Sequence, residues 1–473
     1  MMTPEGAEAL YRQGLEPTVA MLLELSCRVE ELEEKLRTNS SNSSKPPSSD
    51  PPEVKRSARK KRGKRKRGGQ PGHKGATRPL LRLDAVDDIV PCPPPQYCDC
   101  GGPVAREALP PQRQQKVELP KITPTVTEYQ CYCGTCEHCG RRHWGEIPKG
   151  VPAGMLGPRA MAIVALLSGK FHLSKRQVGE ILEDLLGIEV SLGTISNTEA
   201  RVSEALAKPV EEARIFVQQQ PVVHADETGH KVAGKKAWVW VAATISVSVF
   251  LVRINRGANE AKELLGEKFC GWLISDRWSA YTWVDALRRQ LCWAHLERDI
   301  TKISERGGRS EEIGNAILEY VQEMWCLWHR FKSGERSRAW LQKKMQPIRQ
   351  AVEDLLEQGT TCGHSKTSRT CKRILKLKAA LWNFVDTPGV EPTNNFAERV
   401  IRAYVLWRKI SFGTQSDRGN LFVERLMTVT ATCRQQRRNV LKYLTVAIQA
   451  HLRGESAPSL LPQDVATEAS WAA

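Results

Sequence analysis

Short apolar runs mark the central part of the chain. The first run, 222–225, ends in two acids, Asp226 and Glu227, and a turn containing glycine separates it from further runs at 237–243 and 246–253. Runs of this length, bounded by turn residues, predict buried strands. The pattern therefore predicts a sheet whose first strand presents a carboxylate at its far end.

The same pattern recurs further along the chain. The run 271–275 ends in Asp276, and 290–295 has the pattern of another short strand that leads into a helix. Parallel neighbouring strands that end at one edge would place Asp226 and Asp276 side by side, where they repel unless a cation lies between them. We therefore expect a divalent metal there. Glu227 points to the opposite side of an extended backbone and is expected to be an orienting or solvated group.

Helical periodicity dominates much of the remaining chain. Residues 155–205 predict helices, one of which opens at Ser174 and ends at Gly187, while the next begins at Ser191. A helix, a short turn and a second helix resemble helix-turn-helix packing, and a plain helical bundle fits the spacing equally well. Residues 296–385 are strongly helical and basic, and their apolar stripes predict core packing.

A later helix carries the best candidate for a third carboxylate. Thr393 or Asn394 is a suitable N-cap, and Asn394, Glu398 and Arg402 then share one face. Glu398 would lie near the first turn, where the helix dipole favours anions. A basic strip on and after this helix is suited to holding phosphates of a DNA strand. Its members are Arg399, Arg402, Arg408 and Lys409.

The N-terminal part follows other patterns. Apolar residues in 15–37 have coiled-coil spacing, which predicts a helix that either self-associates or packs on its own chain. Residues 38–54 are polar and rich in proline, as in a flexible linker. The basic segment after them is expected to bind phosphates without reading sequence, and the alternative is a solvated tail. The candidate DNA contacts there are Arg62, Lys64, Arg65, Lys66, Arg67 and Lys74.

Clustered cysteines predict a metal site. Six of the 14 cysteines lie between Cys98 and Cys139. Cys136 and Cys139 form a knuckle that can hold one ion, Cys98 and Cys100 form a shorter pair, and 116–132 between them alternates like a strand pair. This plan is that of a zinc ribbon, with free structural thiols as the alternative. The favoured Zn²⁺ ligands are Cys98, Cys100, Cys136 and Cys139, with Cys133 as a rival.

Composition bears on partners and compartment. A length of 473 residues suggests about two to four domains. The net charge of +17 predicts a polyanionic partner. No apolar run is long enough for a membrane span, and the N-terminus lacks the pattern of a signal peptide. We therefore expect an intracellular protein whose clustered cysteines bind metal rather than form disulfides.

Taken in order, these motifs resemble the insertion-sequence-66 family of bacterial transposases. The resemblance covers almost the full length and implies a ribonuclease H-like α/β core with an Asp-Asp-Glu triad, here Asp226, Asp276 and Glu398, with the helical stretch 296–385 as an insertion. Cys98 and Cys100 depart from the family's usual pair, which has two intervening residues. The strings that carry it include N-S-S-N-S-S-K-P-P-S-S-D, K-R-G-G-Q-P-G-H-K-G, L-S-K-R-Q-V, G-T-I-S, H-A-D-E-T, I-S-D-R-W-S-A-Y, C-W-A-H-L-E-R and N-N-F-A-E-R-V-I-R.

The resemblance implies a DNA transposase that binds element ends, cleaves DNA and transfers strands. The triad would bind two Mg²⁺ ions, or Mn²⁺, without a covalent protein intermediate. His295 is expected to hold the metal-binding carboxylates in place, to contact DNA or to be structural. Asn394 is a further candidate for holding these carboxylates in place. Expected partners are DNA, further copies of the chain and accessory proteins of the same element, in the bacterial cytoplasm at the nucleoid. The alternatives are a catalytically inactive DNA-binding regulator and a metal-dependent nuclease without strand transfer.

These expectations divide the chain into eight parts. They are a leucine-patterned helix (1–37), a linker with the basic segment (38–80), a zinc-binding ribbon-like domain (81–150), a helix-turn-helix-like region (151–215), the first part of the catalytic core (216–300), a helical insertion (301–385), the second part of the core (386–453) and a C-terminal tail (454–473).

Overall fold

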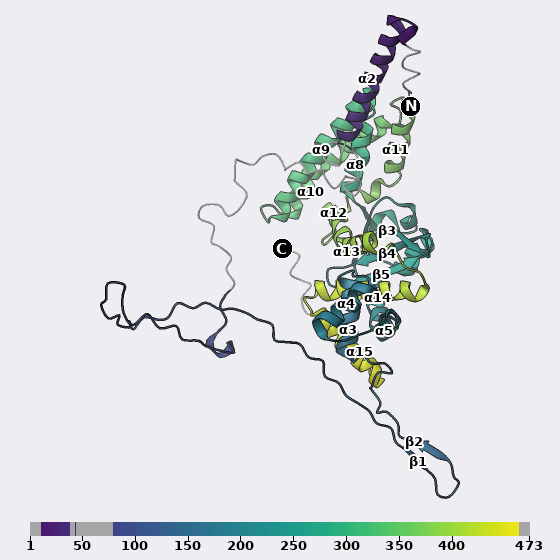
Figure 1. Ribbon diagram of the computed structural model, residues 1–473. Coiled ribbons are helices and arrows are strands. Elements are labelled where there is room, and N and C mark those ends of the chain that lie inside the picture. The colour runs from purple at the N-terminus through teal and green to yellow at the C-terminus, as the bar shows by residue number, and fades with distance from the viewer. Residues whose placement is uncertain (1–10, 38–42, 44–78, 463–473) are drawn as a thin grey trace. The chain divides into compact units, whose positions relative to one another are not determined.

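A five-stranded mixed sheet lies at the centre of the fold (Figure 1), with the strand order β5-β4-β3-β6-β7. β3, β4 and β5 are antiparallel neighbours, whereas β6 and β7 run parallel to β3. β4, β5, β6 and β7 agree with the predicted runs apart from small shifts at their ends. β3 instead continues to Val232, so Asp226 lies within this strand and not at its end, as the run 222–225 had predicted. Their bounds are β3 (Val222–Val232), β4 (Lys235–Ala243), β5 (Ser248–Arg253), β6 (Trp272–Ser275) and β7 (Arg289–Leu291).

The computed structural model describes residues 11–37, 43 and 79–462. They belong to two compact units, one of residues 1–54 and 125–473, which holds the sheet, and one of residues 55–124. In its described part the smaller unit contains the 3-10 turn η2 (Leu83–Ala85) and an isolated bridge between Tyr97 and Pro103. The predicted linker, apart from Ser43, and the candidate DNA contacts between Arg62 and Lys74 lie outside the described residues.

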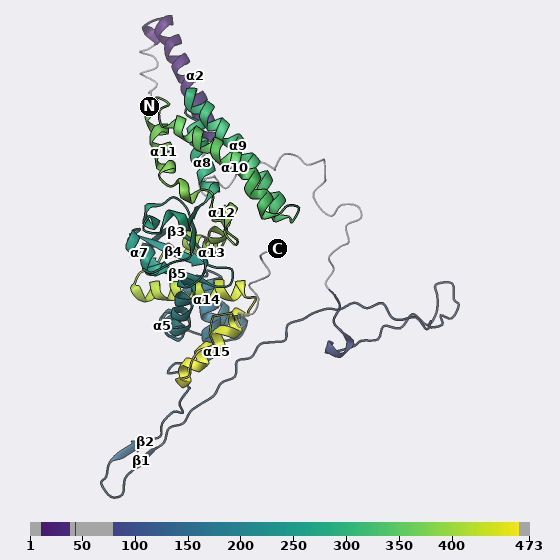
Figure 2. The ribbon, with the colours of Figure 1, turned by 180° about the vertical axis from the view of Figure 1, so that it is seen from behind.

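Side-chain alternation along β4 divides the core around the sheet into two layers. Val239 and Val241 pack with α13 and α14 on one face, whereas Trp240 and Ala242 pack with α6 and α7 on the other. Figure 2 shows α7 beside the strands from behind. The bounds of these helices are α6 (Ala207–Gln218), α7 (Ala258–Leu265), α13 (Asn395–Ser411) and α14 (Asp417–Gln435).

Side chains of α14 close the outer edge of β5, the edge strand of the sheet. Three backbone N–H groups of β5, which no further strand pairs, each donate to a side-chain oxygen of this helix. The pairs are Ser248 with Thr432 Oγ1 (3.1 Å), Phe250 with Thr428 Oγ1 (3.0 Å) and Val252 with Glu424 Oε1 (2.7 Å). Because the acceptors recur every four residues on one helix face, α14 satisfies a strand edge that would otherwise be open to pairing.

A helical insertion separates β7 from α13, as the resemblance implied. It forms its own core, which reaches the sheet through Ile274 and Leu291. In Figure 1, α9 and α10 lie side by side in this insertion. Its helices are α8 (Trp293–Ser304), α9 (Gly308–Lys332), α10 (Arg338–Gly359), α11 (Ser365–Leu375), the 3-10 turn η6 (Lys378–Ala380) and α12 (Asn383–Asp386).

The predicted helices before the sheet are present. The Ser174 side chain caps α4, Gly187 ends α4 with a positive φ of 63°, and the Ser191 side chain caps α5. α5 packs against α3, α4, α6, α14 and α15, which fits a helical bundle, and the helix-turn-helix interpretation of α4 and α5 stays a prediction. The bounds are α3 (Pro158–Ala165), the π-helical turn η3 (Leu166–Lys170), α4 (Lys175–Leu186), α5 (Leu192–Ala205) and α15 (Val440–Arg453).

The N-terminal segment forms the predicted helix, α2 (Leu15–Arg37). Leu22, Leu25 and Val29 of its apolar seam are exposed. Pairing of that seam with another copy stays a prediction. Among the described residues, no helix is both long and apolar enough to cross a membrane.

The cysteine-rich region departs from the predicted ribbon. The predicted strand pair at 116–132 is wrong, since no strand forms there. Pro120 and Pro124 lack the N–H groups that a strand ladder needs. A hairpin of β1 (Cys133–Thr135) and β2 (Arg142–Trp144) forms further along the chain instead.

Candidate functional site

The register of β3 places Asp226 on the face of the sheet that α13 covers. Asp226 lies opposite Val241 of β4, whose side chain packs in the same layer as α13. The parallel pairing of β3 with β6 sets His224 opposite Ile274, and the same register continued by two residues brings Asp276 beside Asp226. The two acids that the sequence paired therefore lie at neighbouring strand positions.

Backbone amides orient both carboxylates. Asp226 Oδ1 accepts a hydrogen bond from the Glu227 N–H at 2.9 Å. Asp276 Oδ1 accepts one from the Trp278 N–H at 2.8 Å. Each of these bonds uses one oxygen of the carboxylate, so the second oxygen can still bind a ligand.

Glu398 lies in the first turn of α13. Asn394 occupies the predicted N-cap position, but its side chain does not cap the helix. Its Nδ2 instead donates to the Ala225 carbonyl at 2.8 Å, and its Oδ1 lies 3.2 Å from His224 Nδ1. Because Ala225 immediately precedes Asp226, the buried Asn394 fixes the start of α13, and with it Glu398, against the acidic strand.

Negative charge accumulates around Asp226. Burial raises the pKa of Asp226 well above its ordinary value, and Glu227, Asp276 and Glu398 raise it further. Such a set of carboxylates carries its full charge only when a cation compensates it. Oxygen donors alone, one within β3, one directly after β6 and one in the first turn of α13, fit a hard divalent cation such as Mg²⁺.

Glu227 points to the opposite face and is buried, which excludes the solvated alternative. Its Oε1 accepts two hydrogen bonds from Arg256, at 2.5 and 3.0 Å, and its Oε2 accepts one from the Tyr281 hydroxyl at 2.7 Å. The Arg256 guanidinium lies between the rings of Trp238 and Trp278, 4.5 and 3.9 Å from their centroids. The network links the residue after Asp226 to the residues after Asp276.

A buried arginine lies behind Asp276. Arg289 Nη2 donates to the Asp276 carbonyl at 3.2 Å and to Ser275 Oγ at 3.3 Å. Burial lowers the pKa of Arg289 to about 10, and the Asp276 charge opposes that shift. The sequence pattern did not identify Arg256 or Arg289. Tyr281 lies shortly after Asp276 in the string I-S-D-R-W-S-A-Y. Its place in that string was the sequence signal that could have identified it.

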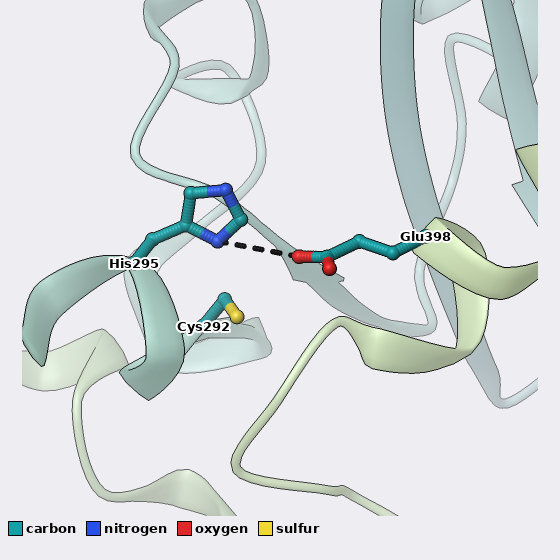
Figure 3. A group of neighbouring side chains, drawn as sticks. All are labelled: Cys292, His295 and Glu398. Carbon is teal, nitrogen blue, oxygen red and sulfur yellow. Dashed lines mark ion pairs between the residues drawn. The ribbon is translucent and has the colours of Figure 1, made fainter. Parts of the chain in front are cut away.

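The structure brings His295 and Cys292 to Glu398 (Figure 3). Donor atoms of these three side chains all lie within 4.8 Å of one another. His295 Nδ1 is 3.6 Å from Glu398 Oε1. Burial lowers the pKa of His295, as does the neighbouring Arg298, and burial raises the pKa of Cys292 to about 11. His295 therefore lies beside a member of the predicted triad.

The predicted basic strip is divided by the fold. Arg399, Arg402 and Lys409 are exposed on α13. Arg408 is half-buried, and its Nη1 donates to Thr228 Oγ1 at 3.0 Å and also to the Gly229 carbonyl. These contacts hold the Arg408 guanidinium against β3, and a DNA contact by Arg408 stays a prediction.

The predicted zinc ligands belong to two units. Cys98 and Cys100 lie in the unit of residues 55–124, and Cys136 and Cys139 lie in the other. Each pair forms a tight turn of its own. A backbone hydrogen bond from Gly102 lowers the pKa of Cys100, and backbone hydrogen bonds from Cys139 and His138 lower that of Cys136. Amides directed at sulfur favour thiolates, the form that binds zinc.

Fold and site define a class first: an α/β protein in which a mixed sheet and an adjoining helix gather carboxylates. Comparison with known proteins then gives the family. The family model described as Transposase IS66 family matches residues 153–421, more than half of the chain, so the chain belongs to the IS66 family of transposases. Membership indicates a DNA-processing enzyme of transposition and recombination that acts on DNA. Residues 4–79 match a family of unknown function, DUF6444.

Two proteins of Sinorhizobium fredii (strain NBRC 101917 / NGR234) are similar over most of their length. The uncharacterized protein y4qI is 26% identical over 423 residues, which cover 80% of this chain and 76% of y4qI. The uncharacterized protein y4hP is 24% identical over 403 residues, which cover 75% of this chain and 71% of y4hP.

Proposed function

We propose that this transposase cleaves DNA at element ends and joins the ends to target DNA, using Asp226, Asp276 and Glu398 as a metal-binding triad. The observation that carries the proposal is the charge of Asp276 and Glu398 near the buried Asp226, since both carboxylates raise the pKa of Asp226. The strand order, with three antiparallel strands followed by two parallel ones, supports a ribonuclease H-like core. The insertion before α13 agrees with that assignment.

The chain's own residues would position and activate the site. Bound Mg²⁺ or Mn²⁺ would lower the pKa of the attacking hydroxyl and stabilise the leaving oxygen. Asp226 and Asp276 would hold the ions from the sheet and Glu398 from the helix. Water would first attack a phosphate at the element end, so that a P–O bond to the water oxygen forms as the bond to the 3′-oxygen breaks and a 3′-hydroxyl is released. That hydroxyl then attacks a target phosphate, so that one P–O bond forms as another breaks.

Several binding regions would serve this chemistry. Exposed Arg399, Arg402 and Lys409 are suited to phosphate contact, as is the basic segment before residue 68. The cysteine pairs are suited to Zn²⁺ because their backbone amides favour thiolates. The exposed seam of α2 is suited to self-association, and accessory proteins of the same element remain expected partners.

One reaction separates the candidate functions. The protein is incubated with DNA that carries element ends, a target plasmid and Mg²⁺. Joined product supports transposase, nicks alone support a nuclease, and DNA binding without either supports an inactive regulator. Asp226→Ala should bind the same DNA and neither nick nor join it, while the exposed control Asp417→Ala should do both. An Asp226→Ala protein that still nicks element ends would contradict the assignment of Asp226 to the triad.

A thermal measurement tests the metal separately from activity. Asp226→Asn removes a charge from a buried carboxylate cluster, so the metal-free variant should unfold at a higher temperature than the wild type. Mg²⁺ should raise the unfolding temperature of the wild type and leave that of Asp226→Asn nearly unchanged. An equal Mg²⁺ effect on both proteins would contradict a site at Asp226.

A further inference from the structure

Cys292, His295 and Glu398 form a second donor group at the edge of the candidate active site (Figure 3). Cys292 immediately precedes α8, His295 lies in its first turn, and Glu398 lies in the first turn of α13. Among the described residues, this is the one set of three or more such donors whose atoms all lie within 4.8 Å of one another. Two helix starts thus aim a sulfur, an imidazole nitrogen and a carboxylate oxygen at one small volume.

The donor types favour a different ion from the acidic triad. A thiolate and an imidazole are soft or borderline ligands that prefer Zn²⁺, whereas Mg²⁺ prefers oxygen and keeps several waters. Zinc–ligand distances of about 2.0 to 2.3 Å place the ligand atoms of a tetrahedral site about 3.3 to 3.8 Å apart. The three donor atoms, which lie within 4.8 Å of one another, would therefore have to move only slightly closer to surround one ion. Three protein ligands leave one coordination position for water or substrate.

Two of these metal-ligand atoms have no hydrogen-bond partner among the described residues. His295 Nδ1 and Glu398 Oε1 are both buried without a hydrogen bond, although they lie only 3.6 Å apart. Buried polar atoms usually have a hydrogen-bond partner. Two neighbouring atoms that both lack one therefore indicate that an ion or ligand binds between them. A cation between the two atoms would satisfy both.

Backbone hydrogen bonds hold Cys292, whose sulfur is the third metal-ligand atom. The Cys292 N–H donates to the Ser275 carbonyl at 2.9 Å, next to Asp276. The Asn394 N–H donates to Cys292 Sγ at 3.2 Å, so the sulfur is held between the end of the sheet and the start of α13. A site whose ligands are already held loses little entropy on binding an ion.

We propose that Cys292, His295 and Glu398 form a zinc-binding site that competes with the catalytic Mg²⁺ for Glu398. Zn²⁺ binding would release the thiol proton to solvent and leave a neutral imidazole as a ligand. Since Glu398 would then coordinate zinc, the triad would lose its helix-borne carboxylate and strand cleavage would stop. The binding part of the inference stands alone, whereas the inhibition rests on the proposed function.

Metal binding is measured on the full-length protein with Co²⁺ as a spectroscopic probe and with Zn²⁺ by calorimetry. The predicted ribbon cysteines would also bind such ions, so the readout is the difference between variants. The wild type should bind one more equivalent than Cys292→Ser or His295→Gln, each of which should weaken that site by more than about tenfold. Cys433→Ser, which changes another buried cysteine, should match the wild type. Circular dichroism confirms that each variant is folded.

Equal numbers of Zn²⁺ equivalents in wild type, Cys292→Ser and His295→Gln would overturn the site. Inhibition is then measured as the ratio of DNA nicking with and without micromolar Zn²⁺ at fixed Mg²⁺. The ratio should fall in the wild type and move towards unity in Cys292→Ser. Zinc binding without loss of nicking would overturn the competition. A wild type that binds the extra zinc but never nicks DNA would count against the proposed function and leave the zinc site in place.

Discussion

The buried Glu227 and the half-buried Arg256 form an ion pair directly behind the acidic site, with Arg256 Nη2 2.5 Å from Glu227 Oε1. Glu227 follows Asp226 in β3, and the Arg256 guanidinium stacks on Trp278, whose backbone N–H orients Asp276. One charged pair therefore connects the segments that carry the two aspartates. This explains why a buried acid lies on the face of β3 that does not carry the candidate site.

We expect Arg256→Ala to damage both stability and activity. The change leaves Glu227 buried and unpaired, which should lower the free energy of unfolding by about 3 kcal/mol. DNA nicking should fall about 10- to 100-fold, because the groups that orient Asp226 and Asp276 lose their support. Urea unfolding and the nicking assay measure the two effects. The exposed Lys268→Ala serves as the control, and an Arg256→Ala protein as stable as that control would contradict a structural role for the pair.

Thr428 stabilises the edge of the sheet. Its hydroxyl accepts the hydrogen bond of the Phe250 N–H, which no other strand satisfies. Thr428→Val keeps the shape of the side chain and removes the acceptor, so the free energy of unfolding should fall by about 1 to 3 kcal/mol. Chemical denaturation measures the loss.

Thr430→Val is the matched control for the edge contact. Thr430 lies on the same helix, but its hydroxyl donates to the Met427 carbonyl of that helix rather than accepting from the sheet. It should therefore cost much less than Thr428→Val. Equal losses from both variants would show that the edge contact contributes nothing beyond the effect of any helix threonine.

The strands and two of the acids were predictable because local pattern determines them. An apolar run that ends in an acid identifies both β3 and β6, and the parallel register then brings Asp226 and Asp276 together. Glu398 was harder to place, since α13 follows the whole helical insertion. The helix pattern made it the best candidate for a third carboxylate, and the family resemblance then assigned it to the triad. The contact of Asn394 with Ala225 links the start of α13 to β3.

Other features depend on tertiary contacts that no sequence period records. Arg256 lies in the connection after β5, where neither helical nor strand spacing applies. Glu424 and Thr428 have the spacing of a solvated helix face, yet they satisfy the edge of β5. The prediction of strands at 116–132 was wrong for a local reason. The alternation of apolar residues predicted strands there, but Pro120 and Pro124 cannot donate to a strand ladder.

His230 should make the protein sensitive to acid. Its ring contacts the Tyr404 hydroxyl and Thr414 Oγ1, and burial lowers its pKa from 6.5 to about 4. The unfolded chain therefore binds a proton at this residue before the native chain does. The stability contributed by the neutral ring is complete above pH 6.5 and is lost as the pH falls towards about 4, by about 1.4 kcal/mol per pH unit.

His230→Gln should remove this part of the pH dependence. The variant should be less stable than the wild type at pH 7, because it loses packing and hydrogen bonds. Its free energy of unfolding should nevertheless fall less steeply between pH 6.5 and 4.5, by up to about 1.4 kcal/mol per pH unit. Urea denaturation at several pH values measures the slopes. The exposed His451→Gln should keep the wild-type slope, and an unchanged slope in His230→Gln would refute the assignment.

Arg402 and Arg408 should respond differently to the same substitution although they lie on one helix. Arg402 is exposed, whereas the Arg408 guanidinium donates to Thr228 Oγ1 and to the Gly229 carbonyl. Arg402→Gln should weaken DNA binding with little loss of stability. The slope of the logarithm of the DNA-binding constant against the logarithm of the salt concentration should become less steep by about one, as expected when one phosphate contact is lost. Arg408→Gln should lower the free energy of unfolding by about 1 to 3 kcal/mol and leave the salt dependence nearly intact. Titrations of labelled DNA at several salt concentrations, with urea unfolding of both variants, distinguish the two roles. If Arg408→Gln lowered the salt dependence as much as Arg402→Gln, Arg408 would contact DNA despite its position against β3.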